Sequence, residues 1–557
     1  MSSRNHSLAQ GTSEHERHDP SGWLVRWNPE RAAALSASGA WPNLTMADCA
    51  ERMVQRDPDR VLVNDGGLAL TAERLFNDAR KLARALIGRG LSPGSRISYQ
   101  LPNWHEPIII DLAATMAGLV VNPLVTIYRE AEISFMMNDC GSRLLFIPGA
   151  FRNYDYVAMA ERILPKLAEP AEIVVVRGDA RHFTAFESLF TSGDPAMPLP
   201  QIDPNSIKLV LYTSGTTGRP KGVLHTHNTV GAMATQFMNH LRLGRHDATL
   251  VASPITHITG AIQACQFPWI SGTRAVLMDV WNGRSAAGLI RRHTITVANG
   301  AAPFVQDLIE AARESGEHLP SLRCFAAGGS AIPEQLGRAA YEQFPNCALF
   351  RCYGATETPT ATAGDPDRGQ LRLNISTDGR PVGTKIKIVD PQSGATLPHG
   401  QVGEIVMLGP QTMLGYLREE DNADAFDSEG YFRSGDLGRF VEHDWLEISG
   451  RKKDIIIRAG ENLSAKEIED ALLDHPSVAM ISVVAKPSPR TGEAACAFIV
   501  TKPGMAITIP DMAAFLIARG FAKQKIPEHL ALVDSLPQTP SGKVQKHILR
   551  ERSKELP

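Results

Sequence analysis

The sequence predicts an α/β protein: a large N-terminal domain of several subdomains with layered α/β sheets, followed by a small, mobile α+β C-terminal domain. The chain has 557 residues, more than a single hydrophobic core usually holds. Short β-branched runs alternate with helical stretches through the first 450 residues, which is typical of layered α/β architecture. A different pattern begins near residue 450 and indicates a separate unit.

The expected strands of the large domain are short and apolar. Examples are "RLLFIP" at 143–148, "AEIVVV" at 171–176 and "TRAVLMD" at 273–279. Residues 72–90 predict a helix, because apolar residues recur there at helical spacing: Leu75, Ala79, Leu82, Leu86 and Ile87. Gly88 or Gly90 can end that helix.

The C-terminal unit starts with a charged turn, a strand and a glycine-containing loop, written "GRKKDIIIRAGENL". A helix should follow, with Ser464 as its N-cap and Glu467 completing a capping box. We therefore expect a flexible tail and lead-in at 1–40, a large N-terminal domain at 41–450 and a small C-terminal domain at 451–557.

Composition excludes several classes of protein. A net charge of -3 gives no reason to expect nucleic acid as a partner. The seven cysteines show no spacing typical of a zinc site, and the polar N-terminus resembles neither a secretory signal nor an anchor. The apolar stretch at 107–121 is short for a bilayer span and contains Asp111, so we expect a buried helix running into a strand, no stable membrane insertion and a cytoplasmic location.

The segment "SGTTGRPKG" at 214–222 combines glycines, hydroxyls and two cations, a set suited to holding phosphate. A surface turn is the simpler reading of such a string taken alone. A strand is expected to enter the segment at 207–213 and another to leave it at 223–226. A Walker loop would require the lysine to open a helix, so that interpretation is weak.

The longer string "LYTSGTTGRPKGV" at 211–223 resembles the phosphate-binding signature of the adenylate-forming (ANL) superfamily, which includes acyl- and aryl-CoA synthetases, adenylation domains and luciferases. Four further stretches follow in that family's order: "YGATET" at 353–358, "YFRSGDLG" at 431–438, "GRKKDIIIRAGENL" at 450–463 and "PQTPSGKVQK" at 537–546. Within that superfamily, the sequence most resembles CoA ligases of medium-chain, alicyclic or aromatic acids.

The resemblance implies two half-reactions. A carboxylate attacks the α-phosphorus of ATP to give acyl-AMP and pyrophosphate, and the thiol of coenzyme A then attacks the acyl carbon. ATP, Mg²⁺ and coenzyme A are therefore the expected cofactors, with a small carboxylic acid as substrate. Because such chemistry depends on positioning and charge stabilisation, cations and amides are expected in place of a nucleophilic side chain. A homodimer is one assembly that the sequence allows.

The resemblance also implies roles for phosphate and metal. Lys221 and Thr216 would act on the phosphates, with the rest of the loop around them: Ser214, Gly215, Thr217 and Gly218. Glu357, together with Thr216, would hold Mg²⁺, which prefers one or two carboxylates plus phosphate oxygens.

The nucleotide would lie against two further segments: Gly328, Gly329 and Ser330, then Tyr353, Gly354, Ala355 and Thr356. Asp436 would accept hydrogen bonds from both ribose hydroxyls, and Arg451 would add a donor there.

The remaining implied roles concern the reacting acid and the thiol. Lys543 would bridge the carboxylate and the α-phosphate, and Lys453 would be the hinge about which the small domain rotates. Gly460 and Glu461 would line the pantetheine passage, and His257 would gate or orient the acid.

Most of the residues expected around the acid are small and none is charged, so an apolar pocket is predicted. They are Thr259, Gly260, Ala261, Cys265, Ala301 and Thr358, beside Gly328, Tyr353 and Gly354. Three alternatives stay open at this stage: an enzyme that loads a separate carrier protein, a luciferase-like oxygenase and a non-catalytic nucleotide-binding protein.

Overall fold

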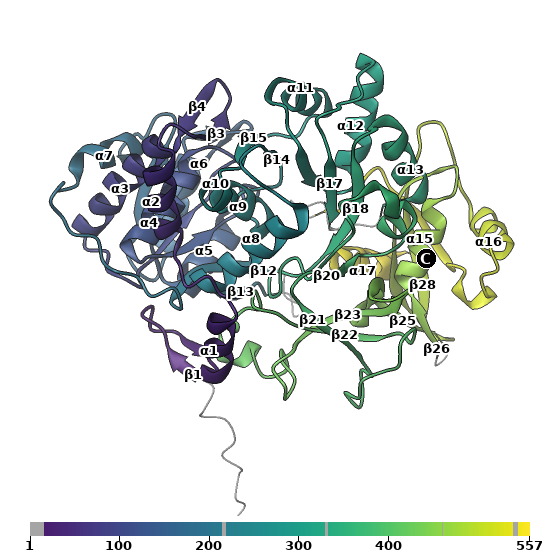
Figure 1. Ribbon diagram of the computed structural model, residues 1–557. Helices are drawn as coiled ribbons and strands as arrows, with labels where there is room; N and C mark the ends of the chain where they lie inside the picture. The colour runs from purple at the N-terminus through teal and green to yellow at the C-terminus, as the bar shows by residue number, and fades with distance from the viewer. Residues whose placement is uncertain (1–15, 214–218, 329–331, 459–460, 539–543, 557) are drawn as a thin grey trace, which may run out of the picture. The chain divides into compact units, whose positions relative to one another are not determined.

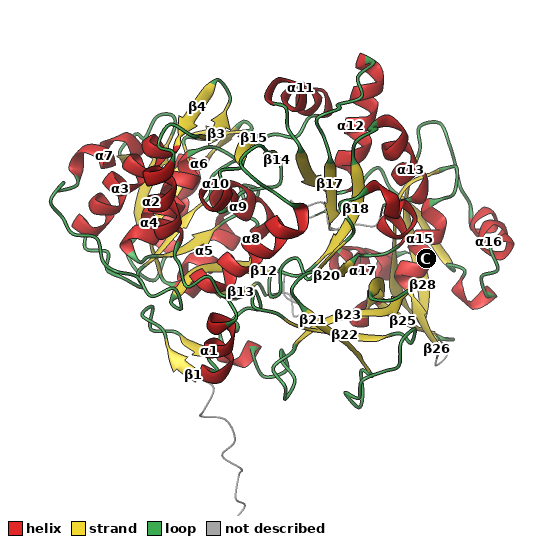
Figure 2. Cartoon of the chain, viewed as in Figure 1, coloured by secondary structure: helices red, strands yellow, loops and turns green. Residues whose placement is uncertain are grey.

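The computed structural model describes residues 16–213, 219–328, 332–458, 461–538 and 544–556 (Figure 1). Helices and strands are interleaved along the chain (Figure 2), and the predicted α/β class is confirmed. The chain forms two compact units, each described by itself below: Met1–Met238, Ile255–Leu277 and Pro410–Phe426 make the first, and Asn239–Pro254, Met278–Gly409 and Asp427–Pro557 the second. The domain boundary expected near Gly450 falls inside the second unit and stays a prediction.

The central sheet of the first unit has the strand order β11-β10-β7-β5-β6-β12-β13. All neighbours run parallel except the last pair, β12 and β13. The strands are β5 (Arg96–Tyr99), β6 (Val120–Pro123), β7 (Ser142–Pro148), β10 (Glu172–Val176), β11 (Thr184–Ala185), β12 (Ile207–Thr213) and β13 (Lys221–Thr226). The expected strand at 207–213 is thus confirmed in full.

Amphipathic and apolar helices pack around this sheet: α2 (Met46–Arg56), α3 (Ala72–Gly88), α4 (Glu106–Ala117), α5 (Glu130–Cys140), α6 (Tyr156–Ile163) and the short α7 (Leu189–Ser192). The helix expected from the spacing of Leu75, Ala79, Leu82 and Leu86 is α3, and those four side chains are buried. It begins after the N-cap Thr71 and ends at Gly88. Gly90 follows with a φ of +80°, a conformation that favours glycine.

The first unit also contains smaller elements. Strand β3 (Val61–Asp65) pairs parallel with β15 (Arg274–Leu277) and antiparallel with β4 (Leu68–Thr71). The hairpin of β8 (Ala150–Phe151) and β9 (Tyr154–Asp155) precedes α6. Short helices α9 (Ile258–Cys265) and α10 (Phe267–Ser271) follow in the chain after α8 (His227–Leu241).

Regular secondary structure begins at Glu16 in the described part of the chain. Strands β1 (Glu16–His18) and β2 (Leu24–Arg26) pair antiparallel, and α1 (Pro29–Ala37) follows. These elements contact distant parts of the chain: Asp19 accepts a hydrogen bond from the backbone N–H of Ile207, and Arg17 donates to the carbonyl of Asn205. The division into a flexible tail and lead-in at 1–40 stays a prediction.

The second unit is built on four parallel strands in the order β18-β17-β16-β14, extended by two short antiparallel strands. They are β14 (Ala248–Val251), β16 (Val297–Gly300), β17 (Cys324–Gly328), β18 (Ala348–Tyr353), β19 (Thr362–Ala363) and β20 (Arg380–Pro381). The helices are α11 (Gly283–His293), α12 (Ala302–Ser315), α13 (Glu334–Gln343) and α14 (Leu371–Ser376).

A four-stranded antiparallel sheet follows, with the order β21-β22-β23-β24. Its strands are β21 (Lys385–Val389), β22 (Gly403–Leu408), β23 (Phe432–Val441) and β24 (Trp445–Arg451). The register of β23 and β24 places Asp436 opposite Arg451.

The last part of the second unit has a five-stranded sheet with its own apolar core. Its elements are β25 (Ile455–Arg458), β26 (Glu461–Ser464), α15 (Ala465–Leu473), β27 (Val478–Ser488), β28 (Gly492–Thr501), α16 (Ile509–Ala518), β29 (His529–Leu532) and α17 (Lys546–Glu555). Ser464 is the N-cap of α15, as expected, and accepts from the backbone N–H of Glu467 at 3.2 Å. The carboxylate of Glu467, however, lies 2.6 and 2.7 Å from Lys525 Nζ, so the structure records only the Ser464 half of the expected capping box.

The apolar stretch at 107–121 is a buried helix, α4, that leads into β6, as predicted. Among the residues that the structure describes, no helix has the length and hydropathy that a membrane span requires. Asp111 on α4 is buried and meets Lys208 on β12, whose Nζ lies 2.9 and 3.0 Å from the two carboxylate oxygens. Lys208 Nζ also donates to Thr115 Oγ1 at 2.9 Å, so this ion pair joins α4 to the sheet from inside.

This buried pair leads to a stability prediction. Asp111→Ala should lower the free energy of unfolding by about 3–5 kcal/mol, because it leaves the Lys208 ammonium buried without its counter-charge. Thermal and urea unfolding of the purified protein, followed by circular dichroism, measure the loss. The double variant Asp111→Leu/Lys208→Met is the control and should recover most of it; a single variant as stable as the wild type would contradict the assignment.

Candidate functional site

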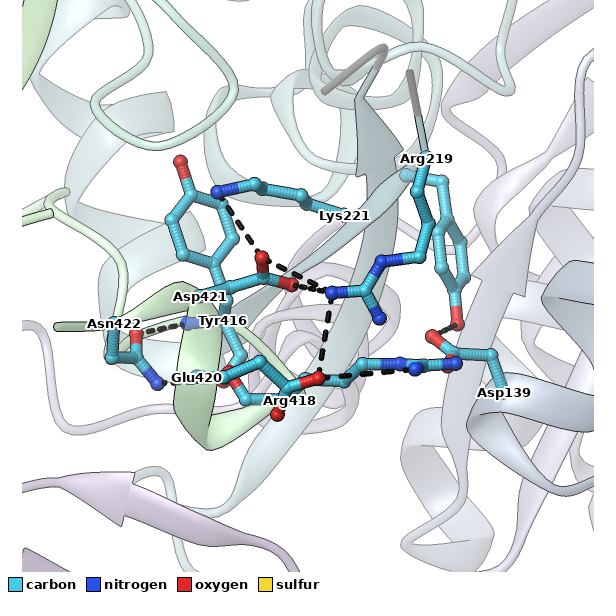
Figure 3. A network of polar contacts seen from close by, with 9 residues as sticks. Asp139, Arg219, Lys221, Tyr416, Arg418, Glu420, Asp421 and Asn422 are labelled. Atoms are coloured by element: carbon cyan, nitrogen blue, oxygen red, sulfur yellow. Dashed lines mark hydrogen bonds and ion pairs between the residues drawn. The ribbon is translucent and has the colours of Figure 1, made fainter. Parts of the chain in front are cut away.

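The hairpin of β12 and β13 carries the first set of expected site residues. Its register pairs Thr213 with Lys221 on either side of the expected phosphate loop. Ser214, Gly215, Thr216, Thr217 and Gly218 lie outside the described residues. Lys221 is 17% exposed at its side chain, and its Nζ lies 3.2 Å from Asp421 (Figure 3).

Lys221 also lies over an aromatic ring. Its Nζ is 4.9 Å from the centroid of the Tyr416 ring, within the range of a cation–π contact. The neighbouring cation Arg219 lies 3.3 Å from Asp421. Two cations therefore flank the end of the loop, and one carboxylate faces both of them (Figure 3).

The second unit aligns the carboxyl ends of three parallel strands. Gly300 of β16 pairs with Ala327 of β17, and Gly328 of β17 pairs with Cys352 of β18. In open α/β sheets, ligands bind in the crevice outside such carboxyl ends. Gly328 ends β17 there; Gly329 and Ser330 lie outside the described residues.

Tyr353, Asp436 and Arg451 meet at this edge. Asp436 on β23 is 6% exposed. Its Oδ2 accepts from the Tyr353 hydroxyl at 2.8 Å, and its Oδ1 accepts from Arg451 Nε at 2.8 Å. Because a carboxylate has about four acceptor positions, these two bonds orient it and leave acceptor capacity for further hydroxyls.

The three groups keep each other in defined charge states. Asp436 raises the pKa of Arg451. Burial raises the pKa of Tyr353 well above its usual value, and the charge of Asp436 adds to that effect. Tyr353 is therefore a neutral donor at physiological pH, and Arg451 is a cation.

The turn after β18 carries Glu357. Ala355 and Thr358 exchange backbone hydrogen bonds of 3.3 and 3.2 Å, which closes the turn. Glu357 is 8% exposed, and Thr356 beside it is half-buried. A buried carboxylate in a fixed turn is a suitable hard oxygen ligand, so the residues present fit the expected Mg²⁺.

The expected hinge residue Lys453 lies in a short 3₁₀ turn, Lys452–Asp454, between β24 and β25. Its side chain is exposed, and its backbone carbonyl accepts from Arg550 of α17 at 3.2 Å. Asp454 pairs with the same arginine. Glu461 is exposed on β26, opposite Arg458; Gly460 and Lys543 lie outside the described residues.

His257 has a local structural task. It is the N-cap of α9, and its Nδ1 accepts from the backbone N–H of Thr259 at 3.4 Å. One ring nitrogen therefore helps to start a helix in the first unit, and the role of His257 toward an acid stays a prediction.

Sequence reasoning missed Asp421 and Tyr416, which meet Lys221 in the structure. The only local signal was the acidic run Glu419, Glu420 and Asp421, which reads as a solvated turn.

Among the described residues of the first unit, one group could also hold a metal ion. The ligand atoms of Asp65, His105 and Glu106 lie within 4.8 Å of one another. Arg177, however, donates to both carboxylates there. Burial alone would raise the pKa of Asp65, but the hydrogen bonds from His105 and Arg177 hold it below its usual value. This cluster is therefore an ion-pair network whose counter-charge is already present.

The family described as "AMP-binding enzyme" matches residues 50–417, and the "AMP-binding enzyme C-terminal domain" matches residues 467–543. A medium-chain fatty-acid–CoA ligase of Escherichia coli is 34% identical over 534 residues, 95% of this chain and 94% of that protein. A salicyl-AMP ligase / salicyl-S-ArCP synthetase of Mycobacterium tuberculosis is 31% identical and spans 95% and 94% of the two chains. The ATP-bound structure of MatB from Rhodopseudomonas palustris superposes with a TM-score of 0.81 at 26% identity, over 92% of this chain and 99% of that one.

Two glycines of the site differ in the space around them, so substituting each one tests a different role: close packing for Gly354 and approach of a ligand for Gly328. A Cβ on Gly354 would lie 2.5 Å from Thr360 N and 3.0 Å from Thr358 O, whereas one on Gly328 would meet nothing nearer than Cys352 O at 3.5 Å. Gly354→Ala should therefore destabilise the protein by about 1–3 kcal/mol, because the turn that carries Glu357 must move.

Gly328→Ala is the matched control and should leave the thermal unfolding midpoint unchanged. Both variants are measured by differential scanning fluorimetry, with and without ATP. Equal midpoints for the two variants would contradict the packing argument, and a loss of ATP stabilisation confined to Gly328→Ala would indicate close approach of the nucleotide.

Proposed function

The chain belongs to the AMP-binding enzymes, the adenylate-forming acid ligases, and on that basis we propose that it joins an apolar carboxylic acid to coenzyme A. The reaction uses ATP. An oxygen of the carboxylate attacks the α-phosphorus and pyrophosphate leaves; the coenzyme A sulfur then attacks the acyl carbon, AMP leaves and the thiol proton is released. Acyl-CoA, AMP, pyrophosphate and the released proton together balance the acid, ATP and thiol consumed.

The observation that carries this proposal is the buried Asp436 carboxylate beside the carboxyl ends of β17 and β18. Its hydrogen bonds from Tyr353 and Arg451 orient it before any ligand arrives. It is therefore prepared to accept hydrogen bonds from the two ribose hydroxyls of ATP. Such preorganisation lowers the ordering that the protein must undergo when the nucleotide binds.

Charge stabilisation would come from the motif residues. Lys221 and the loop Ser214–Gly218 would bind the β- and γ-phosphates, and Glu357 would hold Mg²⁺, which neutralises the phosphate oxygens. Lys543 would bridge the attacking carboxylate and the α-phosphate. These roles follow from the positions of the motifs.

Coenzyme A attack would follow a rotation about Lys453, which brings the segment with Gly460 and Glu461 to the acyl-adenylate. The 3₁₀ turn at Lys452–Asp454, with β-strands before and after it, supports this location, because hinges are commonly a few residues at element ends. A cytoplasmic location and a homodimer stay predictions.

The proposed acid is a medium-chain, alicyclic or aromatic one. Support comes from the medium-chain fatty-acid–CoA ligase among the relatives and from the uncharged residues expected around the acid. A second function, loading an aryl acid onto a carrier protein, is favoured by the relative described as a salicyl-AMP ligase / salicyl-S-ArCP synthetase.

ATP–pyrophosphate exchange with a panel of acids, followed by mass spectrometry of products formed with coenzyme A, tests the proposal. Exchange and an acyl-CoA thioester are expected with apolar acids of graded size. Exchange without a thioester would favour carrier loading or oxygenation. No exchange with any acid would overturn the proposed ligase activity.

Lys543→Ala should separate the two half-reactions. We expect adenylate formation to fall by about 10²–10³-fold, because a cation facing developing charge is lost. Thioester formation from pre-made acyl-adenylate should be largely spared, since the α-phosphate is no longer attacked in that step. Single-turnover kinetics measure both, and equal losses would contradict the role.

Asp436→Ala should weaken ATP binding about tenfold or more, because hydrogen bonds to a charged carboxylate are lost. Isothermal titration calorimetry with ATP measures the change. Tyr353→Phe is the matched variant: it removes one partner of Asp436 but keeps the carboxylate, so the affinity should fall much less. A larger loss in Tyr353→Phe than in Asp436→Ala would count against ribose binding by Asp436.

A further inference from the structure

The segment 414–422 of the first unit lies along the strand that leaves the expected phosphate loop; we call it the brace. Leu414 N donates to Leu224 O and Leu224 N to Gly415 O, each at 3.0 Å, and Leu417 N donates to Gly222 O at 2.7 Å. An antiparallel bridge joins Val223 and Tyr416. The brace thus pairs with β13 on the side away from β12, although about two hundred residues separate the two segments in sequence.

Asn422 closes the brace into a fixed loop. Its Oδ1 accepts from the backbone N–H of Tyr416 at 2.7 Å, and its Nδ2 donates to the carbonyl of the same residue at 3.1 Å. Gly415 has a φ of +121°, and a Cβ there would lie 3.0 Å from Asn422 Oδ1. The backbone at Asp421, next to Asn422, is therefore part of a closed loop.

Asp421 faces both cations of the hairpin. Its side chain is 8% exposed, its Oδ1 lies 3.2 Å from Lys221 Nζ, and both its oxygens lie 3.3 Å from Arg219 Nη2. Glu420 also reaches Arg219, at 3.4 Å, but it is 65% exposed, so water and salt screen that contact. The close group carries two positive charges against one negative charge and keeps a net attraction for an anion (Figure 3).

The brace is joined to the strand that enters the loop as well. The hydroxyl of Tyr212, at the end of β12, donates to Asp139 at 2.8 Å, and Arg418 of the brace pairs with the same carboxylate. Burial raises the pKa of Tyr212, so the hydroxyl keeps its proton and donates at any physiological pH. Charged and polar contacts of the brace thus reach residues on both sides of 214–218.

We propose that Asp421 is a positioning residue that aims Lys221 at the polyphosphate of ATP. A lysine side chain has four flexible bonds and loses rotamer freedom when its ammonium binds a ligand. Because Asp421 and the Tyr416 ring already order Lys221, little of that freedom is left to lose when the phosphates arrive. The inference rests on the proposed function, in which Lys221 binds the β- and γ-phosphates.

The test compares Asp421→Asn with two other variants of the full-length protein. Asp421→Asn keeps the size of the side chain and removes its charge, so KM for ATP and for pyrophosphate in the exchange reaction should rise about tenfold or more. Thioester formation from pre-made acyl-adenylate involves no polyphosphate and should stay within about twofold. Asp421→Glu restores the charge and should recover most of the loss.

Glu419→Gln is the matched control, because Glu419 is exposed in the same 3₁₀ turn as Asp421 and the variant removes an equal charge. It should leave both KM values unchanged. The thermal unfolding midpoint is recorded for every variant, since a purely structural role for Asp421 would lower the midpoint and depress both half-reactions equally.

Three results would overturn the proposal: unchanged KM values in Asp421→Asn, equal loss of both half-reactions, or a fall in KM, which would make Asp421 a competitor of the phosphates. Calorimetry with inorganic tripolyphosphate keeps the test independent of the acid. If the wild type shows no pyrophosphate exchange with any of the acids, the proposed function fails. Even then, a higher Kd for tripolyphosphate in Asp421→Asn than in the wild type supports the positioning role, and an equal Kd refutes it.

Discussion

Parallel pairing in a fixed register is the constraint on which the candidate site depends. Because β16, β17 and β18 run parallel, their last residues reach the same edge of the sheet, and Gly328 comes to lie opposite Cys352, the residue before Tyr353. A shift of one residue in that register would turn Tyr353 to the other face and away from Asp436. Within the first unit, β12 pairs parallel with β6, and its carboxyl end likewise leads directly into the expected phosphate loop.

The charged groups described above differ in burial, and burial decides whether a ligand can reach them. Lys208 and Asp111 satisfy each other deep inside the first unit, so their pair contributes to the structure and has no surface left for a ligand. The side chain of Lys221 is partly exposed to solvent, and that of Arg451 is about half exposed. Partial exposure with a buried counter-charge lets a cation be oriented and still be reached by an anion, which suits electrostatic catalysis.

The shared motifs explain the reaction better than they explain the substrate. Asp436, Glu357 and Lys221 are assigned to ribose, metal and phosphates, which every adenylate-forming reaction has in common. The acid is expected to meet small, uncharged residues such as Ala261 and Gly260, and apolar contact discriminates between substrates by shape and by only a few kcal/mol. The relatives accordingly include ligases of fatty and of aromatic acids around one fold.

Local signals in the sequence determined the elements whose cause lies within a few residues. The strand at 207–213, the helix that ends at Gly88 and the Ser464 N-cap follow from periodicity, a glycine and a hydroxyl, and the structure confirms each of them. The motifs likewise assigned Tyr353, Asp436 and Arg451 to one nucleotide site, and the fold of the second unit brings those three together.

Tertiary structure alone decided the contacts between distant segments. The N-terminal hairpin is ordered through Asn205 and Ile207, Glu467 turned to Lys525, and Asp421 met Lys221, although each segment by itself reads as a polar, solvated stretch. The physical reason is that a charged side chain takes its role from the partner that folding supplies, and a partner 58 to 202 residues away leaves no trace in local pattern.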